Sequence, residues 1–180
     1  TGIVINQSFI IESKSWGTYT LAKAFMSYSV LTVITLFIAG ILIDKFTSKK
    51  LLIYLNLPMF LGLLILIFFN NSFSAFIFMG LIGISNGLTN LLVSSLWAEI
   101  YGVNYLGAIK ALTGALMVFS TAFGTTVFGF LIDFDYSIEN ISFICVIYIV
   151  ISTLIVAIFQ KTYNPILTNK TWFLFFHNIN

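Results

Sequence analysis

Long apolar stretches separated by short polar segments run through the whole sequence. A helix needs about 20 apolar residues to cross a membrane. Five stretches approach or exceed that length, at about 17–43, 51–69, 73–97, 106–132 and 141–159. Residues 1–11 are apolar but too short to cross, which predicts the outer end of a truncated helix. Pro58 lies inside the second stretch and predicts a kink there. The pattern therefore predicts an all-α integral membrane protein.

The composition supports the same class and excludes others. Hydrophobic residues make up 59% of the chain and charged residues 8%, whereas a soluble domain averages about 25% charged. The net charge is only +2 and there is no arginine, so no basic patch for nucleic acid is present. The single cysteine, Cys145, permits neither an internal disulfide nor a cysteine metal site. We expect no metal, no cofactor and no nucleic-acid partner.

The lysines predict the orientation of the chain, because successive loops must lie on opposite sides of the membrane. Six lysines fall on one side: Lys45, Lys49, Lys50, Lys110, Lys161 and Lys170. The other side has Lys14 together with most of the acids, and Trp16 there is expected to anchor at the interface. The positive-inside rule makes the lysine-rich side cytoplasmic, with residues 160–180 as a cytoplasmic tail. A multi-pass protein of a bacterial inner membrane is expected.

The loop after the first full span carries a recognisable pattern. Gly40 is followed by Asp44 and Lys45, and then by a basic pair. This Gly-x-x-x-Asp-Lys arrangement resembles the signature loop of the major facilitator superfamily, between the second and third helices of each six-helix half. Thr47 stands where the family pattern has a second glycine, and residues 96–111 resemble the joint between the tenth and eleventh helices of monocarboxylate and oxalate–formate carriers.

The resemblance covers residues 1 to about 159 and implies helices seven to twelve of a twelve-helix transporter. A five-residue pattern that occurs twice in the sequence is consistent with this architecture. Gly40-Ile-Leu-Ile-Asp44 closes the first full span, and Gly129-Phe-Leu-Ile-Asp133 closes the fourth. The two spans are three helices apart and run in opposite directions, as an inverted three-plus-three repeat requires.

The resemblance also implies a latch beneath the two halves that favours one face of the transport cycle. Five residues at the cytoplasmic helix ends are its candidates: Gly40, Asp44, Lys45, Glu99 and Lys110. The alternative is that these charges flank the spans and only set the topology. That alternative is the better interpretation of Lys49 and Lys50.

Polar residues inside the spans are candidates for a substrate path near the bilayer midplane. Lys23 is the only charge well inside a span, about 9 Å along the helix from Gly17, and Ser27 follows one turn later. Such a lysine would bind the carboxylate of an organic anion or balance an acid in the missing half. Alternatively, its side chain snorkels to the outer interface.

The third span is the most polar. Asn86, Asn90 and Ser94 are spaced four apart and share one helix face, with Gly83 and Gly87 alongside. The amides would line the path, while the glycine spacing favours close packing of two helices; both interpretations can hold together. Gln7, in the truncated helix, is a weaker candidate for the path.

These patterns predict a secondary transporter that moves a small solute by alternating access. Thr1 lies inside an apolar run, so a missing N-terminal half of the same transporter is expected as a partner, besides membrane lipid and the small-molecule substrate. No Ser-His-Asp set, phosphate loop or metal cluster is present, so an enzyme is not expected. The alternative is a non-transporting membrane subunit, scaffold or sensor, in which helix contacts account for Asn86 and Asn90.

Overall fold

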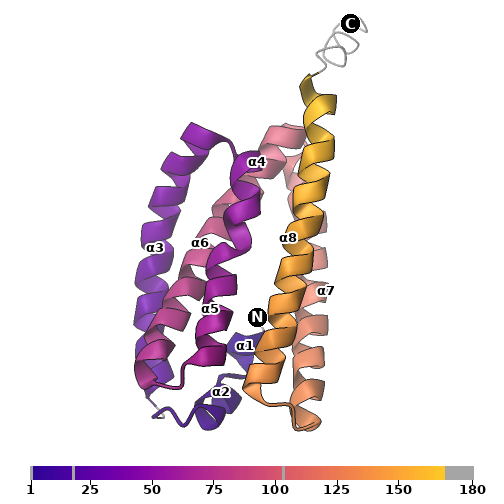
Figure 1. The fold of residues 1–180 in the computed structure, drawn as a ribbon. Helices are drawn as coiled ribbons and strands as arrows, with labels where there is room; N and C mark the ends of the chain where they lie inside the picture. The colour runs from indigo at the N-terminus through magenta and orange to yellow at the C-terminus, as the bar shows by residue number, and fades with distance from the viewer. Residues whose placement is uncertain (1, 18, 103, 169–180) are drawn as a thin grey trace, which may run out of the picture.

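The structure is a computed structural model of the 180-residue chain. It describes residues 2–17, 19–102 and 104–168, with side chains up to Gln160. The described part is helical and forms a bundle whose long helices run alternately up and down (Figure 1). The elements are α1 (Gly2–Ile5), α2 (Gln7–Ser13), α3 (Thr20–Phe46), α4 (Ser48–Leu51), the 3-10 helix η1 (Leu52–Asn56), α5 (Leu57–Phe68), α6 (Ser72–Tyr101), α7 (Leu106–Asp133) and α8 (Ile138–Thr168).

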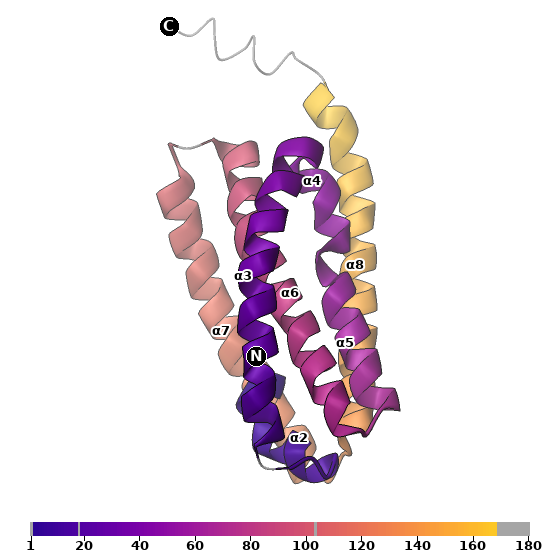
Figure 2. The same cartoon turned by 90° about the vertical axis from the view of Figure 1, so that its left-hand side faces the viewer.

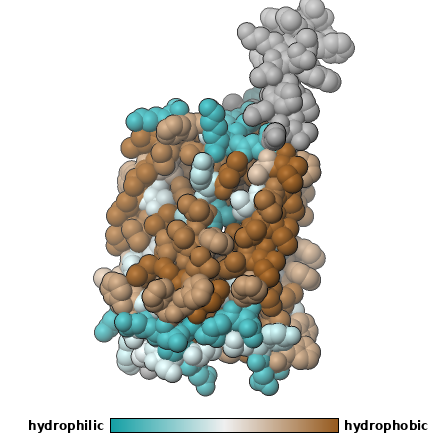
Figure 3. Space-filling model, viewed as in Figure 1, coloured by the Kyte–Doolittle hydropathy of each residue, from teal (hydrophilic) through white to brown (hydrophobic). Residues whose placement is uncertain are grey.

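Five helical segments of the described chain are long and apolar enough to cross a membrane. They are Thr20–Phe46, Ser48–Phe68, Ser72–Tyr101, Leu106–Asp133 and Ile138–Gln160. The prediction of five membrane-length helices is therefore confirmed. On the face drawn in Figure 3, a broad apolar band lies between two hydrophilic ends, as expected for a protein with a hydrocarbon environment around its middle.

The loops sort to the two ends as the lysine pattern predicts. The α3–α4 turn, the α6–α7 turn and the C-terminal end of α8 lie at the upper end in Figures 1 and 2. Short helix α2 and the α5–α6 and α7–α8 turns lie at the lower end. The Gly40–Asp44 motif thus closes α3 at one end, and the Gly129–Asp133 motif closes α7 at the other, which is consistent with an inverted repeat.

The second span is not a continuous α-helix. Its first turn, α4, passes into the 3-10 helix η1 before α5 begins. Pro58 occupies the first turn of α5 and has no N–H to bond the carbonyl of Tyr54. The N–H of Leu57 bonds that carbonyl instead, in the shorter 3-10 pattern. Pro58 therefore lies just after a change of helix type, at the start of α5, and not inside one continuous helix as the predicted kink assumed.

The two ends of the chain differ from the sequence prediction. Near the start, the helix breaks at Asn6, whose side-chain Nδ2 donates to Gly2 O at 2.9 Å. At the other end, α8 continues to Thr168, although a tail was expected from residue 160. Hydropathy marks where the membrane ends and not where the helix ends, so it places the end of the span but misses this extension. Residues 169–180 of the predicted tail lie outside the described residues.

Helix α7 is the least enclosed of the long helices. It contacts α1 and α6, and it stands apart from α3 at the upper end in Figure 2. Phe128 of α7 is buried and lies beside Gly2 at the start of the chain. Along most of its length its apolar side chains are exposed. The core is formed mainly where α3, α5 and α6 pack together with the short N-terminal helices.

One backbone position in the signature loop is strained. Thr47 has φ 64° and ψ 144°, a conformation that favours glycine and disfavours a β-branched residue. The position is the one at which the resembled pattern has its second glycine. We expect Thr47→Gly to stabilise the protein by about 1 kcal/mol, which raises the thermal unfolding midpoint in detergent by about 2–4 °C.

The matched control is Thr113→Gly, the same substitution inside α7, where the backbone is helical. It is expected to lower the midpoint, since glycine in a helix interior loses more conformational freedom on folding. A midpoint for Thr47→Gly at or below that of the unaltered protein would contradict the strain argument.

Candidate functional site

Helices α3 and α6 lie unusually close together along a row of small residues. A Cβ atom added to Gly83 would lie 2.4 Å from the carbonyl oxygen of Tyr28, and one on Gly87 would lie 2.9 Å from that of Thr32. A Cβ on Gly80 would meet the Leu31 side chain at 2.6 Å. Only glycine lets the two backbones approach in this way. The packing interpretation of Gly83 and Gly87 is confirmed.

Polar groups on both helices bond across this contact. The Thr32 hydroxyl donates to Tyr28 O at 2.7 Å and to Gly83 O of α6 at 3.1 Å, so its proton is shared between the helices. The Asn86 side-chain Nδ2 donates to the Tyr28 hydroxyl oxygen at 2.7 Å. A phenol that accepts this bond still has its own proton to donate. The interface therefore presents a hydroxyl donor that is positioned by an amide.

The other predicted path residues have different surroundings. Asn90, one turn beyond Asn86, is exposed, and Ser94 is half-buried. The Ser27 hydroxyl donates to Ala24 O of its own helix at 2.9 Å. Gln7 is half-buried in α2. The structure thus brings Asn86 into contact with Tyr28, a residue that the sequence did not single out, and leaves the amide of Asn90 accessible.

Lys23 lies nearer the helix end than the sequence predicted. Helix α3 begins at Thr20 and not at Gly17, so Lys23 is in its first turn, about 4.5 Å along the axis from the first residue. Its side chain is exposed. This position is within easy reach of the outer interface for a long side chain. The geometry favours an interfacial lysine over one at the bilayer midplane.

At the lysine-rich end, the α3–α4 turn is bonded to two other helices. The Glu99 carboxylate of α6 accepts a hydrogen bond from the backbone N–H of Ser48 at 2.9 Å, and Ser48 is fully buried. The Gln160 side-chain Nε2 of α8 donates to Lys49 O. Of the predicted latch residues, Glu99 therefore already has a partner within this chain, and that partner is a backbone group.

The remaining predicted latch residues do not assemble in the described chain. Asp44, Lys45 and Lys110 are exposed, and no ion pair joins them to another described residue. Gly40 is half-buried and has open space beside it. These charges all lie at the lysine-rich end, where a second surface could meet them. The latch itself stays a prediction.

A buried charge at the opposite end was missed from the sequence. The side chain of Lys14 is fully buried, and its Nζ lies 2.6 Å from Glu139 Oε1 and 2.7 Å from Asn70 Oδ1. The Trp16 Nε1 donates to Asn70 O at 2.9 Å. We call Lys14, Trp16, Asn70 and Glu139 the outer clasp. It joins the start of the chain, the α5–α6 turn and the first turn of α8.

The outer clasp corrects the expectation for Trp16. The residue was expected to anchor in the membrane interface, but only 4% of its surface is exposed. Its ring is part of the core, and its N–H is bonded inside the protein. No local signal identifies this arrangement, since the partners of Lys14 lie 56 and 125 residues away in sequence.

Within the described residues, no group of three or more His, Cys, Asp or Glu side chains could hold a metal ion. In a comparison with protein families, residues 2–173 match the Major Facilitator Superfamily. Comparisons with curated proteins and with solved structures find no match. The family match includes every described helix and extends past residue 159, where the resemblance ended. It does not support the narrower likeness to monocarboxylate and oxalate–formate carriers.

The close packing of α3 against α6 can be tested by adding one methyl group to α6, in the substitution Gly83→Ala. Gly83→Ala would place a Cβ 2.4 Å from a backbone oxygen that cannot rotate away, so the helices must separate. We expect a loss of about 1–3 kcal/mol in the free energy of unfolding, measured in mixed micelles with a denaturing detergent. Gly114→Ala is the matched control, because nothing lies within 4 Å of the added atom in α7. Equal effects at the two positions would contradict close packing at Gly83.

The outer clasp predicts unequal effects for its two charged residues. Glu139→Gln leaves the fully buried Lys14 ammonium without its counter-charge, whereas Lys14→Met leaves a carboxylate whose side chain is 41% exposed to hydration. We expect Glu139→Gln to cost about 2 kcal/mol, less than a fully buried pair, and Lys14→Met to cost less than that. The measurement is again unfolding in mixed micelles.

Glu12→Gln is the control for the clasp, because Glu12 is an exposed acid at the same end of the bundle. It is expected to leave the free energy of unfolding within about 0.5 kcal/mol of the unaltered protein. A larger loss for Lys14→Met than for Glu139→Gln would show that the buried ammonium is not the costly partner.

Proposed function

We propose that this chain functions in transport, because it belongs to the major facilitator superfamily. Proteins of this family are secondary transporters and not enzymes. We infer that the chain is one six-helix half of an alternating-access transporter for a small organic anion. Its partner is then an N-terminal half of the same transporter, and the substrate path lies between the two.

The observation that carries the proposal is the polar face of α6. Asn86 lies 14 residues after the first residue of α6 and 15 before its last, so it is at the middle of a membrane-length helix. The exposed Asn90 follows one turn later. An amide at this depth is costly in contact with lipid tails, where no hydrogen-bond partner is available. Contact with water or with a second protein surface removes that cost.

The chemistry of this face favours an anionic substrate. The Tyr28 hydroxyl retains a proton to donate, since it accepts its bond from Asn86, and the Asn90 amide offers two further donors. In the described chain, Asp44 and Glu99 lie at helix ends and not on this face. Lys23, at the outer end of α3, would attract an anion to the mouth of the path. Carboxylates such as lactate and oxalate are therefore the first substrates to test.

Alternating access needs each half to move as a unit. The bonds within this half support such motion: the outer clasp at one end, the α3–α6 contact in the middle, and the Ser48–Glu99 bond at the other end. We place the lysine-rich end, with the C-terminal end of α8, in the cytoplasm of a cell with a bacterial-type inner membrane. There Gly40, Asp44, Lys45 and Lys110 are free to form a latch with the other half.

A second function has one observation in its favour. The partner of Asn86 is a tyrosine of the neighbouring helix, which is what a non-transporting membrane subunit or scaffold would use to fix its helices. In that case Asn90 faces another protein permanently, and water does not reach it. The two functions therefore differ in the solvent accessibility of Asn90.

Labelling of a cysteine at position 90 tests the proposal. In the full-length protein with Cys145→Ser, we expect Asn90→Cys to react with a water-soluble thiol reagent, because the thiolate forms only where water is present. Lactate or oxalate should slow the reaction at least severalfold by occupying the path, whereas an organic cation should not. Ile151→Cys, at an exposed apolar position of α8, is the matched unreactive control.

Two other results have distinct meanings. No labelling of Asn90→Cys, together with correct membrane insertion, would overturn the path and favour the scaffold. Labelling that organic cations slow and organic anions do not would keep the path and overturn the anionic substrate.

A further inference from the structure

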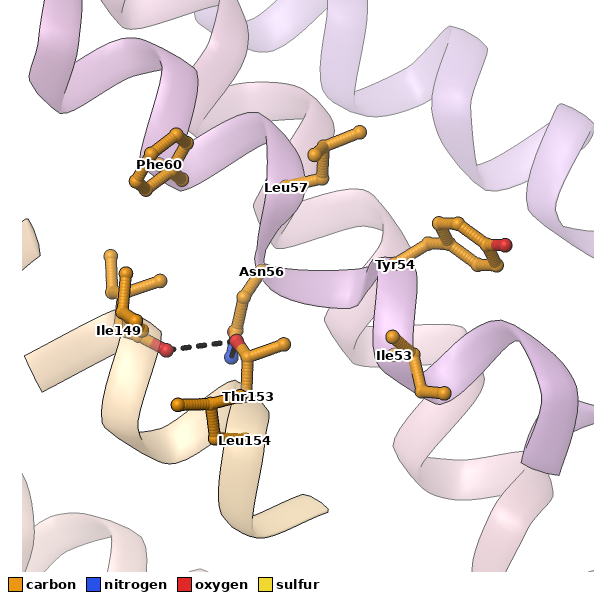
Figure 4. Close-up of a pocket in the computed structure, with 9 residues that line it drawn as sticks. Ile53, Tyr54, Asn56, Leu57, Phe60, Ile149, Thr153 and Leu154 are labelled. Carbon is orange, nitrogen blue, oxygen red and sulfur yellow. Dashed lines mark hydrogen bonds between the residues drawn. The ribbon is translucent and has the colours of Figure 1, made fainter. Parts of the chain in front are cut away.

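An open groove lies on the side of the bundle between the second span and α8. Its volume is about 300 Å³, and its walls are almost entirely apolar. Figure 4 shows the side chains that line it. Those that matter here are Ile53, Tyr54 and Leu57 from η1 and α5, and Ile149, Thr153 and Leu154 from α8.

The groove lies where the second span changes helix type, before Pro58. Residues 52–56 form a 3-10 helix and not an α-helix, so the chain is narrower there and none of its side chains is buried. At the floor, Asn56 Nδ2 donates to Thr153 Oγ1 at 3.2 Å, and Thr153 donates to Ile149 O at 2.8 Å. The polar side chains at the floor thus bond to each other.

Water is a poor occupant for this groove. An ordered water needs two to four polar partners, and the walls offer almost none beyond the bonded floor. Since one water takes about 30 Å³, the volume suits on the order of ten methylene-sized groups. The groove opens within Ser48–Phe68, a segment long and apolar enough to cross a membrane, where lipid tails are the expected surroundings. An acyl chain is the apolar group available at that depth.

Two lysines stand above the groove. Ile53, on one wall of the groove, follows Lys50 by three residues, which is one turn of a 3-10 helix, so Lys50 lies one turn above that wall. Lys50 is exposed and Lys49 is half-buried, and neither forms an ion pair with a described residue. The bond from Gln160 to Lys49 O holds this turn against α8.

The acids of the described chain at the same end, Asp44 and Glu99, form no ion pair with either lysine. Glu99 accepts its bond from the backbone of Ser48, and Asp44 lies in the last turn of α3, before Thr47 turns the chain. The upper end of the groove therefore has two lysines without an ion-pair partner among the described residues, next to an apolar channel. A basic site between helix ends next to an apolar surface is the arrangement that binds an anionic lipid headgroup.

We propose that this groove binds one anionic phospholipid from the leaflet on the lysine-rich side. One acyl chain lies between Leu57 and Leu154, and the headgroup phosphate contacts Lys49 and Lys50, with the Tyr54 hydroxyl below it. The proposal does not depend on the transport function, because it concerns binding at the outer surface of the bundle.

Native mass spectrometry of the full-length protein in detergent tests the site. Phosphatidylglycerol and phosphatidylcholine with the same acyl chains are titrated, and the affinity for the first lipid molecule is measured. We expect phosphatidylglycerol to bind more tightly. In Lys49→Gln/Lys50→Gln its affinity should fall about 30-fold, since each lysine contributes about fivefold near an anionic lipid. The affinity for phosphatidylcholine should change less than about twofold.

Two further variants separate the groove from general surface charge. Lys45→Gln/Lys110→Gln removes two lysines from the same end but away from the groove, and should leave phosphatidylglycerol binding within about twofold. Leu154→Trp fills the groove and should weaken both lipids, and Ile53→Trp does the same from the other wall if the first variant fails to fold. Circular dichroism and a monodisperse elution profile check folding.

Three results would overturn the proposal. The first is equal binding of the two lipids by the unaltered protein. The second is an equal loss in the two double-lysine variants, which would assign the preference to charge over the whole end. The third is undiminished binding when either tryptophan variant folds normally.

Discussion

The contact of α3 with α6 is the interaction on which this structure depends most. Lipid tails are as apolar as leucine, so helices in a membrane gain little by burying leucine against leucine and associate through close packing instead. Gly83 and Gly87 bring the α6 backbone against the carbonyls of Tyr28 and Thr32. That approach also allows the two interhelical hydrogen bonds, because Thr32 reaches Gly83 O only where no side chain intervenes. The glycines thus position the Tyr28 hydroxyl as well as the helices.

The two ends of the bundle are fixed by different chemistry. At the outer end, a buried ammonium bridges Glu139 and Asn70, so three segments distant in sequence are joined through one charge. At the lysine-rich end the bonds involve backbone groups, from Ser48 to Glu99 and from Gln160 to Lys49. Among the described lysines of that end, Lys45, Lys49, Lys50 and Lys110 form no ion pair with a described residue. Lys14 is therefore buried and joins segments of the protein at the outer end, whereas Lys45, Lys50 and Lys110 are exposed at the other end.

Hydropathy predicted the membrane-length helices, because the thickness of the membrane sets the length of an apolar run. The lysines predicted how the loops sort to the two ends. The spacing of Gly83 and Gly87 predicted a close contact, but one sequence does not say which helix makes it. The partner of Asn86 was missed for the same reason, since Tyr28 lies 58 residues away. The depth of Lys23 was overestimated because the apolar run begins at Gly17 and the helix at Thr20. Trp16 was misplaced because an aromatic residue next to a span fits the interface and the core equally well.

The polar side chains at membrane depth separate two kinds of surface on this bundle. Asn56 and Thr153 bond to each other at the floor of a groove, so an apolar molecule can cover them without leaving a donor unpaired. Asn86 is bonded as well, but through a hydroxyl whose own proton is uncommitted. Asn90, one turn further along α6, is exposed. A lipid chain can cover the groove at Asn56 and Thr153 without leaving a polar group unpaired. It cannot cover the α6 face in the same way, because it offers no acceptor for the Tyr28 proton or the Asn90 amide. The pairing of polar groups, more than hydropathy, therefore distinguishes the face of this bundle that lipid can cover from the face that needs water, a solute or another protein.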